Sequence, residues 1–222
     1  MTLRAPRRTS LATRVLLPAA LLLAAVPTWA HAQQIDQEYT AKIREFTTEP
    51  FFLTPYVDHL PASATVPTPL KFLGHIAGAA DILTYPEDIH RYLRAVAEAS
   101  PRVRVFNIGT TEEGREMILA VVSSEENLAR LEEFKGMMAQ LADPRKLDAA
   151  AAEALFRTVK PMYWATGAMH SSETGSPEML MELVYRLAVG ESPFIQAIRN
   201  NLIFMATPVL EVDGRAKQVD IA

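Results

Sequence analysis

The sequence has no cysteine among its 222 residues. This absence excludes disulfides, cysteine nucleophiles and thiolate metal sites, so any metal must be held by His, Asp or Glu. Stability must therefore come from a hydrophobic core. A chain of about 190 residues, the length left after the leader described next, can build one core of domain size.

Long hydrophobic runs are also missing. The longest, from Val15 to Val26, is interrupted by Pro18 and is too short to span a bilayer comfortably. A basic leader without acidic residues precedes it, and Ala30-His31-Ala32 follows it with the small-residue spacing of a signal peptidase site. We therefore expect residues 1–32 to be a signal peptide and the protein to be exported, to the periplasm or the extracellular space. The alternative is a membrane-anchored or buried N-terminal helix.

Basic residues are scarce once the leader is removed. The leader holds four of the 22 basic residues and none of the 26 acidic ones, which leaves a net charge of about −8 with neutral histidines. A surface of that sign argues against a nucleic-acid partner, which requires a basic patch. No later apolar stretch is long enough to cross a membrane.

Regular patterns begin near residue 81. Residues 33–80 are punctuated by prolines and predict an irregular lead-in segment, in which His59 and His75 are ordinary surface or packing residues. A helix is predicted from Thr84-Tyr85-Pro86-Glu87 to residue 99, with Thr84 as a helix-start hydroxyl. Two strands, 103–108 and 117–122, flank a polar turn and predict a hairpin, and helices are predicted over 125–142 and 148–158.

The next segment alternates strand and helix. Residues 162–168 predict a buried strand, a helix opens at Ser176-Pro177, and residues 202–207 predict a second strand. This order implies a right-handed crossover between parallel neighbours. The predicted fold class is α/β, with a mixed parallel and antiparallel sheet flanked by helices and residues 81–222 forming one domain region.

One segment carries recognisable chemistry. His170 and Glu173 lie three residues apart, where a parallel strand ends and before a helix begins. That edge of an open α/β sheet is where ligands bind, and zinc accepts both imidazole and carboxylate donors. The spacing alone occurs by chance in many proteins, so His170 could instead cap the strand while Glu173 faces solvent.

Four segments occur in an informative order: the helix at 86–99, Gly109-Thr-Thr-Glu-Glu-Gly-Arg115, His170-Ser-Ser-Glu173, and Thr207-Pro-Val-Leu-Glu-Val-Asp-Gly-Arg215. Together they resemble the amino-terminal half of the M14 zinc metallocarboxypeptidase family over roughly residues 81–222. The resemblance implies that His170 and Glu173 are two ligands of a catalytic Zn²⁺. It also implies hydrolysis of a peptide or peptide-like substrate near its free carboxylate by a metal-activated water.

The other parts of that active site have no matching motif in this sequence. The resemblance implies that the second histidine ligand, the asparagine–arginine pair, the tyrosine and the general-base glutamate follow Ala222. We therefore expect no catalytic general base here, and little activity from this chain as an incomplete fragment. His90, on the early helix, is not expected to be a ligand.

The sequence also departs from the family pattern. Glu211-Val212-Asp213-Gly214 replaces the usual Asn-Pro-Asp-Gly, and we expect it to form a turn. Ser171 and Ser172 stand where pancreatic-type members have a substrate-binding arginine. We expect Arg115 and Arg215 to form structural ion pairs or to be solvated.

Two other functions stay open. Peptidoglycan amidases and aspartoacylase-like deacylases use the same strand-end His-x-x-Glu arrangement. The chain could also be a non-catalytic exported binding module.

Overall fold

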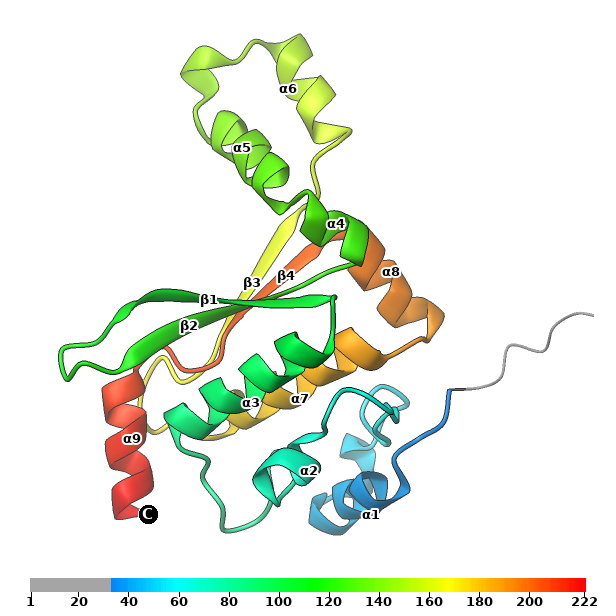
Figure 1. The fold of residues 1–222 in the computed structure, drawn as a ribbon, viewed down its shortest axis with the longest axis vertical. Coiled ribbons are helices and arrows are strands. Elements are labelled where there is room, and N and C mark those ends of the chain that lie inside the picture. The colour runs from blue at the N-terminus through cyan, green and yellow to red at the C-terminus, as the bar shows by residue number, and fades with distance from the viewer. Residues whose placement is uncertain (1–32) are drawn as a thin grey trace, which may run out of the picture. The chain divides into compact units, whose positions relative to one another are not determined.

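A four-stranded mixed sheet forms the centre of the computed structural model, which describes residues 33–222 (Figure 1). The strands are β1 (Val103–Thr110), β2 (Glu116–Val122), β3 (Met162–Thr166) and β4 (Ile203–Thr207), in the spatial order β1-β2-β4-β3. β2 runs antiparallel to β1 and to β4, whereas β3 and β4 are parallel. The predicted α/β class, the hairpin and the parallel pair are confirmed. The predicted signal peptide, residues 1–32, lies outside the described residues.

The main core lies between the sheet and two long helices. α3 (Pro86–Ala99) and α7 (Gly175–Val189) pack against each other and against the sheet (Figure 1). Alternate residues of β2, including Ile118 and Ala120, point into this layer because successive side chains of a strand face opposite sides. The buried helix residues include Ile89, Leu93, Val96, Leu180 and Val184.

A smaller core lies on the opposite face of the sheet. Val121 and Ile203 pack there with Leu128, Leu131 and Phe134. The last three come from α4 (Glu125–Ala129) and α5 (Leu131–Ala142), and η2 (Pro144–Lys146) and α6 (Ala149–Phe156) follow them in the chain.

The single helix predicted over 125–142 was wrong, because the chain breaks at Arg130, with φ −103° and ψ 14°. The short first helix leaves Asn127 free to donate side-chain hydrogen bonds to Ser123 Oγ and the Arg199 carbonyl. These bonds connect α4 to the end of α8 (Pro193–Asn201).

β3 is not the buried strand that the sequence predicted. It pairs only with β4 in the described part of the chain, so it forms an edge of the sheet. Tyr163 and Trp164 are consequently 63% and 55% exposed, although the Trp164 indole still donates a hydrogen bond to Thr207 Oγ1 at 3.0 Å. An apolar run predicts burial only where neighbouring elements cover both faces.

The segment before α3 is more regular than predicted. It contains α1 (Gln37–Phe46), η1 (Pro50–Phe52) and α2 (Pro69–Leu73), and its buried Tyr39, Leu60 and Ile76 belong to the main core. Residues 33–222 form one compact unit. The boundary predicted at residue 81 is tested by no observation and remains a prediction.

Two helices near the end of the sequence were not predicted. α8 (Pro193–Asn201) follows α7, and α9 (Val212–Ile221) begins where a turn was expected at Asp213-Gly214. The turn prediction was wrong because Glu211 caps a helix there: its side chain accepts a hydrogen bond from the Gly214 amide at 2.9 Å. No helix among residues 33–222 is long and apolar enough to cross a membrane.

Candidate functional site

The His170–Glu173 loop leaves the carboxyl end of β3 and leads into α7 (Figure 1). Ala168 starts the loop with φ +42°, a left-handed conformation that a non-glycine residue rarely adopts. Its amide donates to Ser176 Oγ at 2.9 Å, and the Ser176 hydroxyl donates to the Glu173 carbonyl at 3.3 Å. Through these two hydrogen bonds, Ser176 in the first turn of α7 holds the start of the loop at Ala168 and its end at Glu173.

His170 and Glu173 face each other within this loop. Nδ1 of His170 lies 2.9 Å from Oε1 of Glu173, and the His170 amide donates to Oε2 at 3.2 Å. The hydrogen bond from the His170 side chain, followed by that from its amide, lowers the pKa of Glu173. The side chains are 73% and 47% exposed, so both can be reached from solvent.

The pair fits part of a zinc site. Two donors of one tetrahedral zinc ion lie about 3.4 Å apart when each bond is about 2.1 Å. The observed 2.9 Å is close to this value, and small rotations of two exposed side chains would supply the difference. However, residues 33–222 contain no group of three or more His, Asp or Glu that could hold a metal ion. The structure thus brings the two predicted residues together without a third ligand.

Backbone contacts hold the loop against the segment that follows β4. The Gly167 amide donates to the Thr207 carbonyl, and the amides of Leu210 and Glu211 donate to the carbonyls of Gly167 and Ala168, all at 2.8–2.9 Å. Position 167 must be glycine for this approach, because a Cβ there would lie 2.4 Å from the Pro208 carbonyl oxygen.

The Asp213-Gly214 pair lies directly beside the loop. A Cβ on Gly214 would lie 2.9 Å from the Ser171 Cβ. Asp213 accepts hydrogen bonds from Thr111 Oγ1 and the Arg115 guanidinium, both at 2.8 Å. Burial alone would raise the pKa of Asp213, but these hydrogen bonds outweigh it and lower the pKa. Asp213 therefore joins the 109–115 turn to the segment that supports the His170 loop, and the expected Arg115 ion pair is confirmed.

Arg215 anchors the other side of the same loop. Its fully buried guanidinium donates to Glu178 Oε1 at 3.0 Å and to the carbonyls of Thr84 and Thr174. Thr174 directly follows Glu173, so the buried pair supports the His170–Glu173 loop. Thr84 does not cap α3 as predicted; its hydroxyl donates to Glu178 Oε2 instead. The sequence predicted the Arg215 ion pair but carried no signal for these partners.

The other histidines lie outside this loop. Nδ1 of His59 lies 2.5 Å from the adjacent Asp58 carboxylate, and Nδ1 of His75 lies 3.1 Å from the Ile76 carbonyl oxygen. His90 is buried on α3, and the expectation that it is not a metal ligand remains a prediction.

Comparisons with solved structures find partial matches. Three similar solved structures are a metallo-carboxypeptidase from Burkholderia cenocepacia, carboxypeptidase A from Helicoverpa armigera, and thrombin activatable fibrinolysis inhibitor. In the same order, sequence identities are 19%, 20% and 16%, and TM-scores are 0.42, 0.43 and 0.45. The matches cover 60%, 63% and 80% of this chain but only 28%, 28% and 33% of those chains. A search of curated protein sequences found no match.

The sequence profile of one family matches a continuous stretch of the chain. The profile describes zinc carboxypeptidases, peptidase family M14, and it matches residues 89–219, which is more than half of the sequence. This stretch begins within α3 and ends within α9, so it contains the His170–Glu173 loop together with Gly167, Asp213 and Arg215. The chain belongs to the zinc carboxypeptidase family, peptidase M14.

Proposed function

We propose that this chain contributes two zinc ligands, His170 and Glu173, to a metallocarboxypeptidase-type hydrolase. The substrate would be a peptide or peptide-like amide, cleaved near its free carboxylate. We further propose that the protein is exported after removal of residues 1–32 and acts in the periplasm or outside the cell.

The observation that carries the proposal is the convergence of two metal-binding atoms at a strand end. Nδ1 of His170 and Oε1 of Glu173 lie 2.9 Å apart, both exposed, on a loop held at both ends. The carboxyl end of a parallel strand is where open α/β sheets bind ligands. The other histidine–carboxylate pair on a loop of residues 33–222, His59 with Asp58 at 2.5 Å, lies between η1 and α2 and not at the end of a sheet strand.

In this family, bound zinc would polarise the scissile carbonyl and lower the pKa of a water molecule. The residues of this chain would bind the ion and keep it at the sheet edge. The neutral His170 ring would offer Nδ1, and the ionised Glu173 would offer a carboxylate oxygen. Because a zinc site with two protein ligands is weak, we expect the isolated 222-residue chain to bind zinc loosely and to hydrolyse peptides slowly.

The test is isothermal titration of the purified chain with Zn²⁺ at pH 7. We expect one weak site per chain, and at least about tenfold weaker binding in His170→Ala and in Glu173→Ala, since each removes one of two ligands. His75→Ala is the matched control, because it removes a histidine outside the loop and should leave the affinity unchanged. Unchanged zinc affinity in both ligand variants would refute the assignment.

A further inference from the structure

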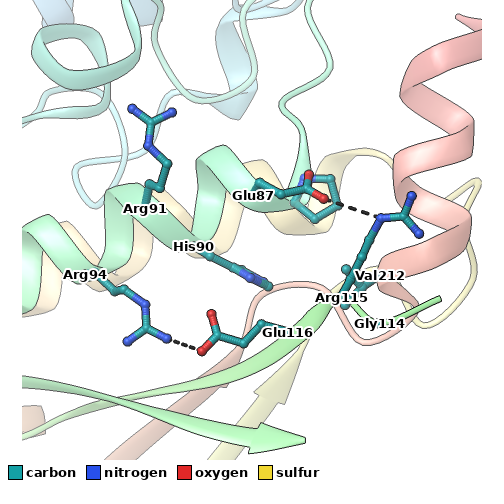
Figure 2. A pocket seen from close by; sticks show the side chains of 9 residues that line it. Glu87, His90, Arg91, Arg94, Gly114, Arg115, Glu116 and Val212 are labelled. Carbon is teal, nitrogen blue, oxygen red and sulfur yellow. Dashed lines mark hydrogen bonds and ion pairs between the residues drawn. The ribbon is translucent and has the colours of Figure 1, made fainter. Parts of the chain in front are cut away.

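A cleft lies away from the His170 loop. It has a volume of about 410 Å³ and lies between α3, the end of the β1–β2 hairpin and the first turn of α9 (Figure 2). Its walls carry Glu87, His90 and Arg94 from α3, Arg115 and Glu116 from the hairpin, and Val212 from α9. No part of the proposed zinc site contributes to it.

His90 lies within this cleft with an unused polar atom. The residue is only 5% exposed, and its Nε2 has no hydrogen-bond partner among the residues that the structure describes. Burial lowers the pKa of His90 to about 4, so the ring is neutral near pH 7. Buried polar atoms are almost always hydrogen-bonded, and an unpaired one in a cleft indicates a missing partner. The tautomer with its proton on Nδ1 presents a lone pair at Nε2.

The charges around His90 favour a cation. Figure 2 shows its ring between the carboxylates of Glu87 and Glu116. Arg94 pairs with Oε1 of Glu116, which leaves Oε2 without a partner among the described residues. At the other end of the cleft, Arg115 is surrounded by three carboxylates, those of Glu87 at 3.4 Å, Glu113 and Asp213.

The balance of this cluster is therefore negative. Arg94, Arg115 and Lys217, which pairs with Glu113, supply three positive charges. The four carboxylates that they contact supply four negative charges. Arg91, at the rim, is paired with Asp88 and adds no net charge. The cleft wall itself carries two carboxylates and three guanidinium groups, and each guanidinium is paired with a carboxylate. A small cation is therefore favoured beside His90, where Nε2 and Oε2 of Glu116 are acceptors without a partner among the described residues.

We propose that this cleft binds a protonated primary alkylamine whose ammonium group donates hydrogen bonds to His90 Nε2, Glu87 and Glu116. An ammonium group has three donors, which matches the three acceptors. The alkyl part would lie against the apolar side chains of Pro86 and Val212, which also line the cleft. A metal ion fits less well, because these three residues do not form a metal-binding group.

The amine could come from a free diamine or from a lysine side chain, and two probes separate these sources. The full-length chain is titrated at pH 7 with 1,5-diaminopentane and with Nα-acetyl-lysine methylamide, while the histidine ring signals are followed by NMR. Saturable shifts of the His90 signals are expected. Binding of both probes assigns the cleft to lysine side chains, whereas binding of the diamine alone assigns it to free diamines. Tetramethylammonium carries the charge without N–H donors and should not bind.

Two variants test the contacts, and a third serves as the control. His90→Phe keeps a planar ring but removes Nε2, and Glu116→Gln keeps the shape but removes one charge. Each should weaken amine binding by at least about tenfold, as expected from the loss of one charge-assisted hydrogen bond. His75→Phe, the matched control, should bind as the unmodified chain does. Circular dichroism reports whether each variant is folded. If His90→Phe does not fold, the result for Glu116→Gln alone decides whether the proposal holds. The proposal is overturned if neither amine binds, if tetramethylammonium binds equally, or if folded Glu116→Gln binds with unchanged affinity.

Discussion

Acidification from pH 7 to pH 5 should destabilise this protein through His90. The pKa of His90 is about 4 in the folded chain, against an ordinary histidine value of 6.5, because burial disfavours the charged ring. Between these two values the unfolded chain binds more protons than the folded chain, so the free energy of unfolding falls as the pH falls. The full loss, reached below pH 4, is about 3 kcal/mol, and about 2 kcal/mol of it occurs between pH 7 and pH 5.

The neighbours of His90 support this assignment of the pH range. Glu87 and Arg94 face it from α3, and Glu116 faces it from β2. Arg94 lowers the pKa of Glu116 through their hydrogen bond, so this carboxylate stays ionised between pH 7 and pH 5. Glu116 should therefore add little to the pH dependence that His90 produces in that range.

The measurement is urea unfolding, followed by circular dichroism at half-unit steps from pH 7 to pH 4.5. His90→Phe provides the reference, because it cannot titrate while the rest of the chain does. The stability difference between the unmodified chain and this variant should shift by about 2 kcal/mol, to the disadvantage of the unmodified chain, between pH 7 and pH 5. A difference that stays constant, or that moves in the opposite direction, would refute the argument that burial keeps His90 neutral.

Two further substitutions probe the supports of the candidate site, both measured as the free energy of unfolding in urea. Gly167→Ala should lower the free energy of unfolding by about 2 kcal/mol or more, because its Cβ would lie 2.4 Å from the Pro208 carbonyl oxygen. The control Gly175→Ala should be tolerated, because a Cβ there would have no atom within 4 Å. Equal effects of the two substitutions would contradict the close approach at Gly167. Arg215→Met should lose about 3–5 kcal/mol, because Glu178 would stay buried without a counter-charge. Adding Glu178→Met should restore most of the loss, and a double variant as unstable as Arg215→Met would contradict this reasoning.

Much of the fold could be predicted because its signals are local. The period of apolar residues in α3 and the proline at its first turn predict that helix, and the polar turn between two apolar runs predicts the hairpin. The errors concern tertiary context. Tyr163 and Trp164 form an apolar strand whose burial depends on which elements lie beside it, and no local pattern reports that. α9 was missed because Asp213-Gly214 is a common turn pair, and the cap that starts a helix there is a glutamate.

The candidate site could be predicted only in part, for the same reason. The three-residue spacing of His170 and Glu173 is visible in the sequence, and it places both groups on one loop. What holds that loop is not visible: Gly167, Asp213 and Arg215 each act through a partner far away in the chain. Such pairs appear only when the ends of β3 and β4 are brought together.

These distant pairs explain why the four sequence segments occur together. The 109–115 turn contacts Asp213, Gly214 closely approaches Ser171, and Arg215 donates to Thr174 and to the segment that starts α3. Each segment therefore constrains the loop that carries His170, directly or through one neighbour. A chain that lost one of the four would loosen the same loop, whichever was lost. Their joint presence is thus a physical requirement for holding the side chains of His170 and Glu173 at one point, independent of what other residues surround them.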